Sequence, residues 1–384
     1  MKILHTSDWH LGHQLYAYDR NEEQQEMLRQ IGDIVAERQP DVLVVSGDIY
    51  HTSQPSAAIQ TLFSQTMVQM HRRCPQMMIV ITAGNHDSAS RHEIFRVPWQ
   101  EMNVWAIGTV DKDHPERHII EVHGKGFVVA VPYCHERNMP EGFFQELLDR
   151  VAQRNGDGLP VVLMAHTTVS GSDFTGHDHA TDYQVGGIDG VDLALLGQGY
   201  DYLALGHIHH AQFVHGSGRR ARYSGTPLPV SFDETFIHSV SWVEIGGHGD
   251  QPEVETVEIN NPHPLVTLPA HQPVEWAEAL RLLKDFPDDL PAYVRMNVRV
   301  DDFLSPEAQM EAMAAVEDKR CRFCYIKTVR EVAPHMQQQV FSVAEFQAQA
   351  PIDIARRYAE DKGFPFDDDM QAMFREAQRR VNET

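Results

Sequence analysis

The sequence has little cysteine and no long apolar run. Only four of its 384 residues are cysteines, so we expect no disulfide framework, and a reducing, cytoplasmic setting fits. No segment reaches the roughly 20 consecutive apolar residues that a membrane-spanning helix needs. The first residues, MKILHTSDWH, lack the apolar core of a signal peptide. We therefore expect a cytoplasmic protein with no membrane association.

Positive charge is also scarce. The chain has 32 Lys and Arg residues against 55 Asp and Glu residues, which gives a net charge of −23. Because nucleic acids normally select a basic surface, this balance argues mildly against a nucleic-acid partner. One strip, KRCRFCYIKTVR (319–330), carries five basic residues and no acid. If the protein binds a polyanion, then its own negative charge must be offset by metal ions, by this strip or by a partner.

The composition is otherwise that of a globular protein, with 42% apolar and 23% charged residues. Five short apolar runs alternate with segments of helical periodicity, such as the one containing Met27, Ile31 and Val35. Continuous runs of this length predict buried strands of an α/β sheet. The runs are KILH (2–5), DVLVVS (41–46), MMIVIT (77–82), PVVLMA (160–165) and YLALG (202–206).

Each run is followed by residues that can bind a metal or move a proton. After the last run, in LGHIHH (205–210), alternation along an extended chain places His207 and His209 on one face. Because ligands of open α/β sheets bind beyond the carboxyl ends of the strands, we expect these side chains to gather at one edge of one sheet. A single such residue is more often a helix cap or a turn residue, but five runs together favour one site. The residues are Asp8 and His10; Asp48 and His51; Asn85, His86 and Asp87; His166; and His207 and His209.

Seven of these side chains predict a centre with two metal ions, because seven ligands are too many for one ion with an open position. With Asp48 as a bridge, each ion has four protein ligands, and the ions lie about 3.5–4 Å apart. Imidazole and oxygen ligands without thiolate favour Mn²⁺, Fe²⁺ or Zn²⁺, and we expect Mn²⁺. The predicted ligands are Asp8, His10, Asp48, Asn85, His166, His207 and His209.

Two such ions suit displacement at phosphorus, and three neighbouring residues are candidates for the proton transfers. His86 follows the ligand Asn85 and is expected to stabilise or protonate the leaving oxygen, with Asp87 orienting its ring. His51 is a second candidate for positioning the phosphate or the leaving group. A structural histidine is the alternative at both positions. His13, His177 and His179 are expected to be solvated.

The motifs D-x-H, GD, GNH, a later lone His and GHxH, in this order, resemble those of the calcineurin-like metallophosphoesterases. Many phosphomonoesterases of that superfamily have GDxxD, whereas position 51 is His here, which points to the nuclease branch. The stretches closest to the SbcD family of bacterial double-strand-break repair nucleases are TSDWHLG (6–12), SGDIYH (46–51), AGNHDS (83–88), LGHIHH (205–210) and YSGTPLPVSFDE (223–234).

The resemblance implies an α/β fold: a β-sandwich flanked by helices, a small α+β capping domain and C-terminal helices. The implied divisions are a nuclease domain at 1–275, a capping domain at 281–333 and a partner-binding segment at 340–384. It implies that Asp8, His10, Asp48 and His209 hold the first ion, and that Asp48, Asn85, His166 and His207 hold the second. His86 and His51 fall on the family's catalytic histidine positions.

The implied activity is Mn²⁺-dependent cleavage of DNA, exonucleolytic at double-strand ends and endonucleolytic at single strands, hairpins and blocked ends. The implied partner is SbcC, an ATPase of the structural-maintenance-of-chromosomes type with a long coiled coil, in a 2:2 assembly that acts in DNA repair at the nucleoid. One alternative is a phosphomonoesterase or cyclic-nucleotide phosphodiesterase on the same fold, which fits the acidic charge better. A binding scaffold without catalysis is another, although all seven ligands are present.

The C-terminal third predicts strand–helix–strand over 281–333. Alternation in AYVRMNVRV (292–300) places its apolar residues on one face and Arg295, Asn297 and Arg299 on the other, which is either solvated or contacts DNA. The odd spacing of Cys321 and Cys324 sends their sulfurs to opposite faces of a strand, which argues against a metal site there.

Two surfaces are candidates for docking other chains. Helices near 56–73 and 88–102 are candidates for a dimer interface. Near the C-terminus, an apolar stripe either packs on the same chain or docks on the partner's coiled coil. The stripe consists of Met370, Met373, Phe374, Ala377 and Val381.

Overall fold

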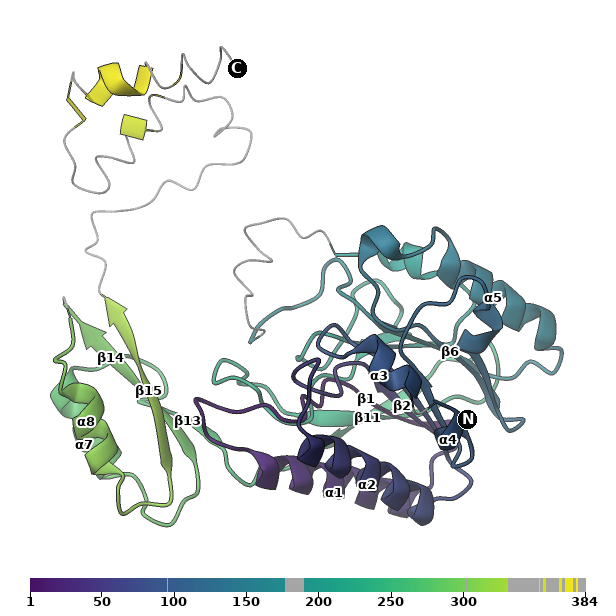
Figure 1. Ribbon diagram of the computed structural model, residues 1–384, viewed down its shortest axis with the longest axis horizontal. Helices are drawn as coiled ribbons and strands as arrows, with labels where there is room; N and C mark the ends of the chain where they lie inside the picture. Colours follow the sequence, from purple (N-terminus) through teal and green to yellow (C-terminus); the bar gives the residue numbers. More distant parts are fainter. Residues whose placement is uncertain are drawn as a thin grey trace. The chain divides into compact units, whose positions relative to one another are not determined.

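The computed structural model describes residues 1–94, 96–176, 190–301 and 303–330, together with 352, 355–356, 366–367, 370–375 and 378 (Figure 1). The chain divides into two compact units, Met1–Val329 and Arg330–Thr384. The architecture below is that of the first unit. No helix among the described residues combines the length and the apolar character that crossing a bilayer requires.

A first sheet of six strands is built around the N-terminal strand. Its first four strands along the chain are parallel, and the other two are antiparallel to their neighbours. Apolar residues of its outer face pack on Ile31 of helix α1 (Asn21–Arg38) and Phe63 of helix α2 (Ala57–Arg73). The strand order is β12 (Glu253–Glu258), β11 (Ser239–Glu244), β1 (Lys2–Thr6), β2 (Val42–Ser46), β3 (Met78–Thr82) and β4 (Val104–Ile107).

A second sheet of six strands is covered by helix α5 (Phe143–Arg154), whose Leu147 and Val151 pack against Leu163 and Leu205. This helix lies on the opposite side of the strands from α1 and α2 (Figure 1). The strand order is β5 (Ile119–Val122), β6 (Gly126–Ala130), β7 (Val161–His166), β8 (Tyr202–Gly206), β10 (Ala221–Tyr223) and β9 (Gln212–Phe213).

The two sheets pack face to face, so the architecture is helix, sheet, sheet, helix. Val44 and Val80 of the first sheet share one core with Val162 and Met164 of the second. The strands β1, β2, β3, β7 and β8 therefore bury both faces, one against the other sheet and one against helices, which explains the continuous apolar runs. All five predicted strands are present, as β1, β2, β3, β7 and β8. The β-sandwich flanked by helices that the resemblance implies is confirmed. The strand ends were expected at one edge of one sheet, and that detail is wrong, because β7 and β8 belong to the second sheet.

A third sheet follows in the chain, with the order β13 (Leu265–Leu268), β14 (Tyr293–Val300) and β15 (Arg322–Arg330). Helices α7 (Trp276–Lys284) and α8 (Ala308–Ala315) bury one face against Met296 and Val298. The other face contributes Tyr293 to a small cluster with Leu15 and Phe232. Two of these elements, β13 and most of α7, precede residue 281. Cys321 and Cys324 lie in the two different clusters, as their spacing predicts.

Short helices complete the unit. They are α3 (Ala89–Ile94), α4 (Arg96–Gln100) and the 3₁₀ turns Pro115–His118, Glu136–Asn138 and Leu193–Leu196.

Gly206, at the end of β8, allows the two sheets to approach closely. A Cβ atom there would lie 1.9 Å from the carbonyl oxygen of Ser46, at the end of β2. No side chain fits in that space, so only glycine lets the carboxyl ends of these two strands meet. The polar residues that follow them are thereby brought to one edge of the sandwich.

Candidate metal centre

The seven predicted ligands lie together at the carboxyl edge of the sandwich, and both sheets contribute. Three strands of the first sheet lead into Asp8 and His10, Asp48, and Asn85, while the second sheet supplies His166 at the end of β7 and His207 and His209 after β8. Their donor atoms form two sets. Asp8, His10 and His209 have donor atoms within 4.8 Å of one another, and so do Asp48, His166 and His207.

Asp48 lies between the two sets. Its Oδ2 atom is 3.4 Å from Nε2 of His166 and 3.8 Å from Nε2 of His10. The side-chain oxygen of Asn85 adjoins the second set, at 2.9 Å from Nε2 of His166 and 3.0 Å from Nδ1 of His207. A carboxylate placed in this way can be shared by two cations.

The hydrogen bonds on the outer side of the histidines fit bound cations. Nδ1 of His166 donates to the carbonyl oxygen of Ser46 at 2.8 Å, which leaves the Nε2 lone pair pointing into the site. Nδ1 of His209 donates to Oε1 of Glu234 at 2.7 Å, and its Nε2 lies 3.2 Å from Nε2 of His10. Imidazoles held by carbonyl or carboxylate acceptors, with their lone pairs converging on carboxylates, form a typical metal-binding arrangement. The residues present therefore fit divalent ions that accept nitrogen and oxygen ligands.

Four of the seven residues have left-handed backbone conformations. The φ angles are 53° at Asp8, 44° at His10, 51° at Asp48 and 98° at His207. Each such non-glycine residue costs on the order of 1–3 kcal/mol, and such strain concentrates at functional sites. Backbone hydrogen bonds hold the loops in place, including Asp8 N–H to the Gly47 carbonyl at 3.0 Å and His10 N–H to the Asp48 carbonyl at 3.1 Å.

Burial and neighbouring charge perturb the titration of the site in opposite directions. Burial lowers the pKa of His10 well below its ordinary value. Burial also disfavours the charged form of His166, but the adjacent Asp48 outweighs it and raises the pKa to about 9. For His209 the opposing charge is that of Glu234, and the pKa is again raised to about 9. Burial alone would raise the pKa of Asp48, but His166 lowers it.

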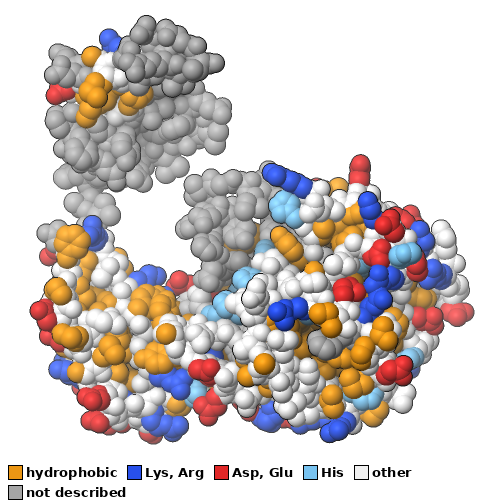
Figure 2. Space-filling model, viewed as in Figure 1, with side chains coloured by type: hydrophobic (Ala, Val, Ile, Leu, Met, Phe, Trp, Pro, Cys, Tyr) orange, Lys and Arg blue, Asp and Glu red, His pale blue; other side chains and the backbone are white. Residues whose placement is uncertain are grey.

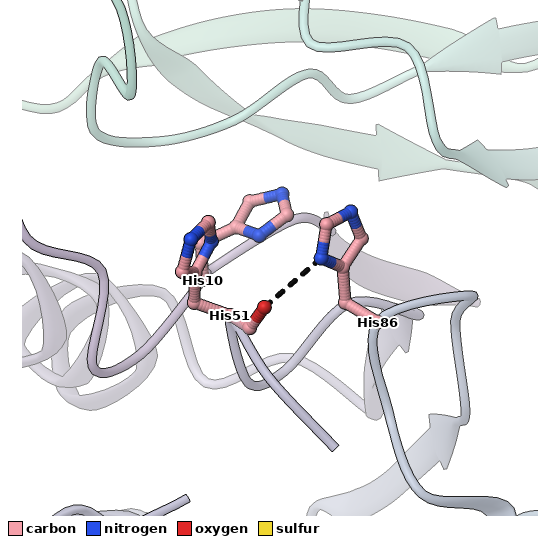
Figure 3. A group of neighbouring side chains, drawn as sticks. All are labelled: His10, His51 and His86. Carbon is pink, nitrogen blue, oxygen red and sulfur yellow. Dashed lines mark hydrogen bonds between the residues drawn. The ribbon is translucent and has the colours of Figure 1, made fainter. Parts of the chain in front are cut away.

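The two predicted catalytic histidines lie beside the first set of ligands. Nδ1 of His86 donates to the carbonyl oxygen of His51 at 2.9 Å, and the two rings stack with centroids 5.6 Å apart (Figure 3). The ring of His86 also lies 5.0 Å from that of His10, centroid to centroid. With Nδ1 occupied, the free ring nitrogen of His86 is Nε2.

Asp87 was predicted to orient the ring of His86, but its hydrogen bonds go to backbone groups. Its carboxylate accepts hydrogen bonds from the backbone N–H groups of Gly84, Ile49 and Tyr50, at 2.8, 3.1 and 2.9 Å. Asp87 therefore joins the Asn85 loop to the loop after Asp48, while the carbonyl of His51 orients the His86 ring.

His13 is partly buried and not fully solvated, contrary to expectation. Its ring packs against that of His51 with centroids 4.7 Å apart, and burial lowers its pKa to about 3. His177 and His179 lie outside the described residues.

The segment Phe232–Glu234 has a role that the sequence did not reveal. The Glu234 side chain is fully buried behind His209, and its Oε2 accepts from Val230 N–H at 3.1 Å. Arg295 holds the preceding residues, with bonds of 2.6 Å to Asp233 and 3.2 Å to the Phe232 carbonyl. The expectation that Arg295 is solvated or contacts DNA is wrong, because it is only 6% exposed. The motif SFDE (231–234) is the sequence signal for this role, but the sequence alone does not distinguish a buried glutamate such as Glu234 from a solvated one.

Comparison with known proteins places these features in a family context. A family model described as calcineurin-like phosphoesterase matches residues 1–211. The SbcD component of the nuclease SbcCD from Rhodobacter capsulatus is 30% identical over 312 residues, which cover 74% of this chain and 75% of that protein. The SbcD of Bacillus subtilis strain 168 is 30% identical over 333 residues, which cover 80% and 81%. The SbcD of Escherichia coli K12 is 26% identical over 360 residues, which cover 86% of each chain.

Metal binding should strengthen as the pH rises toward 9. A protonated imidazole cannot donate a lone pair, and the raised pKa values of His166 and His209 mean that each must lose its proton before it binds a cation. Calorimetric titration of Mn²⁺ in buffers of different ionisation enthalpy should reveal proton release at neutral pH that disappears above pH 9. An affinity that does not vary with pH would contradict this expectation.

Replacement of Glu234 should weaken metal binding without unfolding the protein. Glu234→Ala removes the acceptor that fixes the His209 ring, and the loss of such an outer partner typically costs about 10- to 100-fold in metal affinity. Glu258→Ala, on an exposed position of β12, is the control. Dissociation constants from calorimetry and melting temperatures should be compared. Equal metal affinity in the two variants would refute a positioning role for Glu234.

Proposed function

Since the chain belongs to the calcineurin-like phosphoesterases, and within them to the SbcD family of nucleases, we propose that it hydrolyses DNA phosphodiester bonds at a centre of two divalent ions, Mn²⁺ for preference. The observation that carries the proposal is the convergence of seven nitrogen and oxygen donors from two sheets, with Asp48 between the two sets. We further propose exonucleolytic cleavage at double-strand ends, endonucleolytic cleavage of single strands and hairpins, and a role in DNA repair at the nucleoid.

In this proposal the ligands divide between the two ions as their contacts suggest. Bound divalent ions supply Lewis acidity, which lowers the pKa of water and neutralises charge on the phosphate oxygens. Asp48 would be shared by the two ions, and each of the remaining residues would hold one ion. Asp8, His10 and His209 complete the first set, and Asn85, His166 and His207 complete the second.

His86 is proposed to hold the proton for the leaving oxygen. In the imidazolium form both ring nitrogens carry hydrogen, and Nδ1–H donates to the carbonyl of His51. Nε2–H is then the donor that faces the substrate, and the carbonyl keeps the ring in that orientation. His51 supports the His86 ring by stacking, and Asp87 acts through the backbone of the neighbouring loops.

Cleavage of end-labelled linear duplex DNA by the purified chain should require Mn²⁺ and fail in EDTA. His86→Ala should lose about 10²- to 10⁴-fold in rate, the usual contribution of a general acid, while its metal content stays unchanged. A phosphomonoester assay runs beside it. Brisk monoester hydrolysis without DNA cleavage, in the presence and absence of SbcC, would favour the phosphomonoesterase alternative.

We propose that SbcC is the partner and that the functional assembly is a 2:2 complex with a nuclease dimer. The dimer is proposed to form through α2, α3 and α4, where Ile94 and Val97 are each 67% exposed. The divisions expected from the sequence were a nuclease domain at 1–275, a capping domain at 281–333 and a partner-binding segment at 340–384. Because β13 pairs with β14, we propose that the nuclease domain ends and the capping domain begins at β13, and we keep the partner-binding segment. Most of that last segment lies outside the described residues, but 370–375 is helical, and Met370 and Met373 are 41% and 72% exposed.

A charge placed on this helix should weaken partner binding. Met373→Asp removes an adaptable apolar contact and adds a carboxylate that would have to be desolvated at the interface. Co-purification with SbcC should fall, whereas Met310→Asp, at an exposed position of α8, should leave it unchanged. If Met373→Asp retains full co-purification, docking through this stripe is ruled out.

A further inference from the structure

An exposed tyrosine lies beside the second set of metal ligands. The side chain of Tyr133, which follows β6, is 38% exposed, and its ring meets that of His166 edge-on with centroids 6.2 Å apart. Its backbone N–H donates to the carbonyl of Ala83 at 2.8 Å, two residues before Asn85. Tyr133 is thus attached to the loop that supplies Asn85, and its partly exposed ring adjoins the buried ring of His166.

A second exposed tyrosine adjoins the segment Phe232–Glu234, which supports the ligand His209 of the first set of metal ligands. Tyr16 is 49% exposed and has a φ of 48°, a conformation that is unusual for a bulky residue. Its ring stacks on that of Tyr325, with centroids 4.5 Å apart and an interplanar angle of 24°. It also lies 6.0 Å from the ring of Phe232, two residues before the partner of His209. Backbone strain that is kept in place by such packing is a common sign of function.

Charge limits how this protein can hold DNA. A net charge of −23 opposes binding through phosphates. On the face drawn in Figure 2, Lys and Arg side chains are interspersed with Asp and Glu and do not form one basic patch. Stacking of bases on aromatic rings does not depend on net charge, and it contributes substantially to the binding of single strands. Rings that their neighbours already hold lose little freedom when a base stacks on them.

We propose that Tyr133 and Tyr16 are stacking platforms for the nucleobases on either side of the phosphate at the metal centre. The ligand class is a DNA strand with unstacked bases, because a base inside a duplex has both faces covered by its neighbours. Recognition is independent of sequence, since every base has a π face. The proposal rests on the proposed nuclease function and specifies how that site holds its substrate.

The test combines removal of the ring with removal of the base. Fluorescence anisotropy, with Mn²⁺ present, compares a labelled phosphorothioate strand with one of equal length that carries abasic positions. The unaltered protein should bind the ordinary strand roughly 10-fold more tightly. Tyr133→Ala and Tyr16→Ala should each lose most of that preference, and Tyr133→Phe and Tyr16→Phe should keep it. Phe303→Ala, which removes an 85% exposed ring from the loop before α8, is the matched control.

Two results would overturn the proposal that these tyrosines are stacking platforms. One is that both alanine variants keep the full preference for the ordinary strand over the abasic strand. The other is that Phe303→Ala loses as much of that preference as they do. Hydrolysis of bis(p-nitrophenyl) phosphate by the unaltered protein tests the metal centre separately, because this diester has no base. A base preference without hydrolysis would contradict the nuclease function and leave the platforms standing. Hydrolysis without a preference for the strand with bases would support the nuclease function and contradict the stacking platforms.

Discussion

One hydrogen bond between the two sheets, from Nδ1 of His166 to the carbonyl oxygen of Ser46, sets the geometry of the metal centre. It joins the carboxyl end of β7 in the second sheet to that of β2 in the first, and it also fixes the tautomer that leaves Nε2 free to bind a cation. Gly206 makes room for this contact, since a side chain there would meet the same carbonyl. The packing of the sandwich and the orientation of a metal ligand are therefore set by the same few atoms.

The strained loops follow from this arrangement. The strands must end and turn sharply for their side chains to reach a point between two sheets, and Asp8, His10 and Asp48 adopt left-handed conformations as they do so. The cost is distributed over backbone hydrogen bonds between neighbouring loops and over cores that bury both faces of every central strand. A rigid scaffold of this kind lets the donors converge before a cation arrives, so little reorganisation opposes binding.

The sequence predicted the strands and the ligand residues because both leave local signals. A buried strand is a continuous apolar run, and His or Asp directly after several such runs is improbable by chance. Pairing is not a local property, so the runs could not reveal that β7 and β8 belong to a second sheet. The same limit applies to long-range contacts. The alternation in β14 correctly separated its two faces. Only the fold shows that the polar face of this strand is covered at Arg295 by Phe232 and Asp233. Asp87 and His13 were misjudged for the same reason.

The third sheet supports the metal centre through the face of β14 that carries Arg295. The guanidinium group of Arg295 bonds both the Asp233 carboxylate and the Phe232 carbonyl, a two-pronged contact that the ammonium group of lysine does not reproduce. Glu234 follows directly and holds the ring of His209. A ligand of the metal centre is thus positioned by a strand some sixty residues further along the chain. If a ligand of the third sheet moved Arg295, the support of the His209 ring would change with it, and because linkage is reciprocal, cation binding would then favour or oppose that ligand by the same free energy.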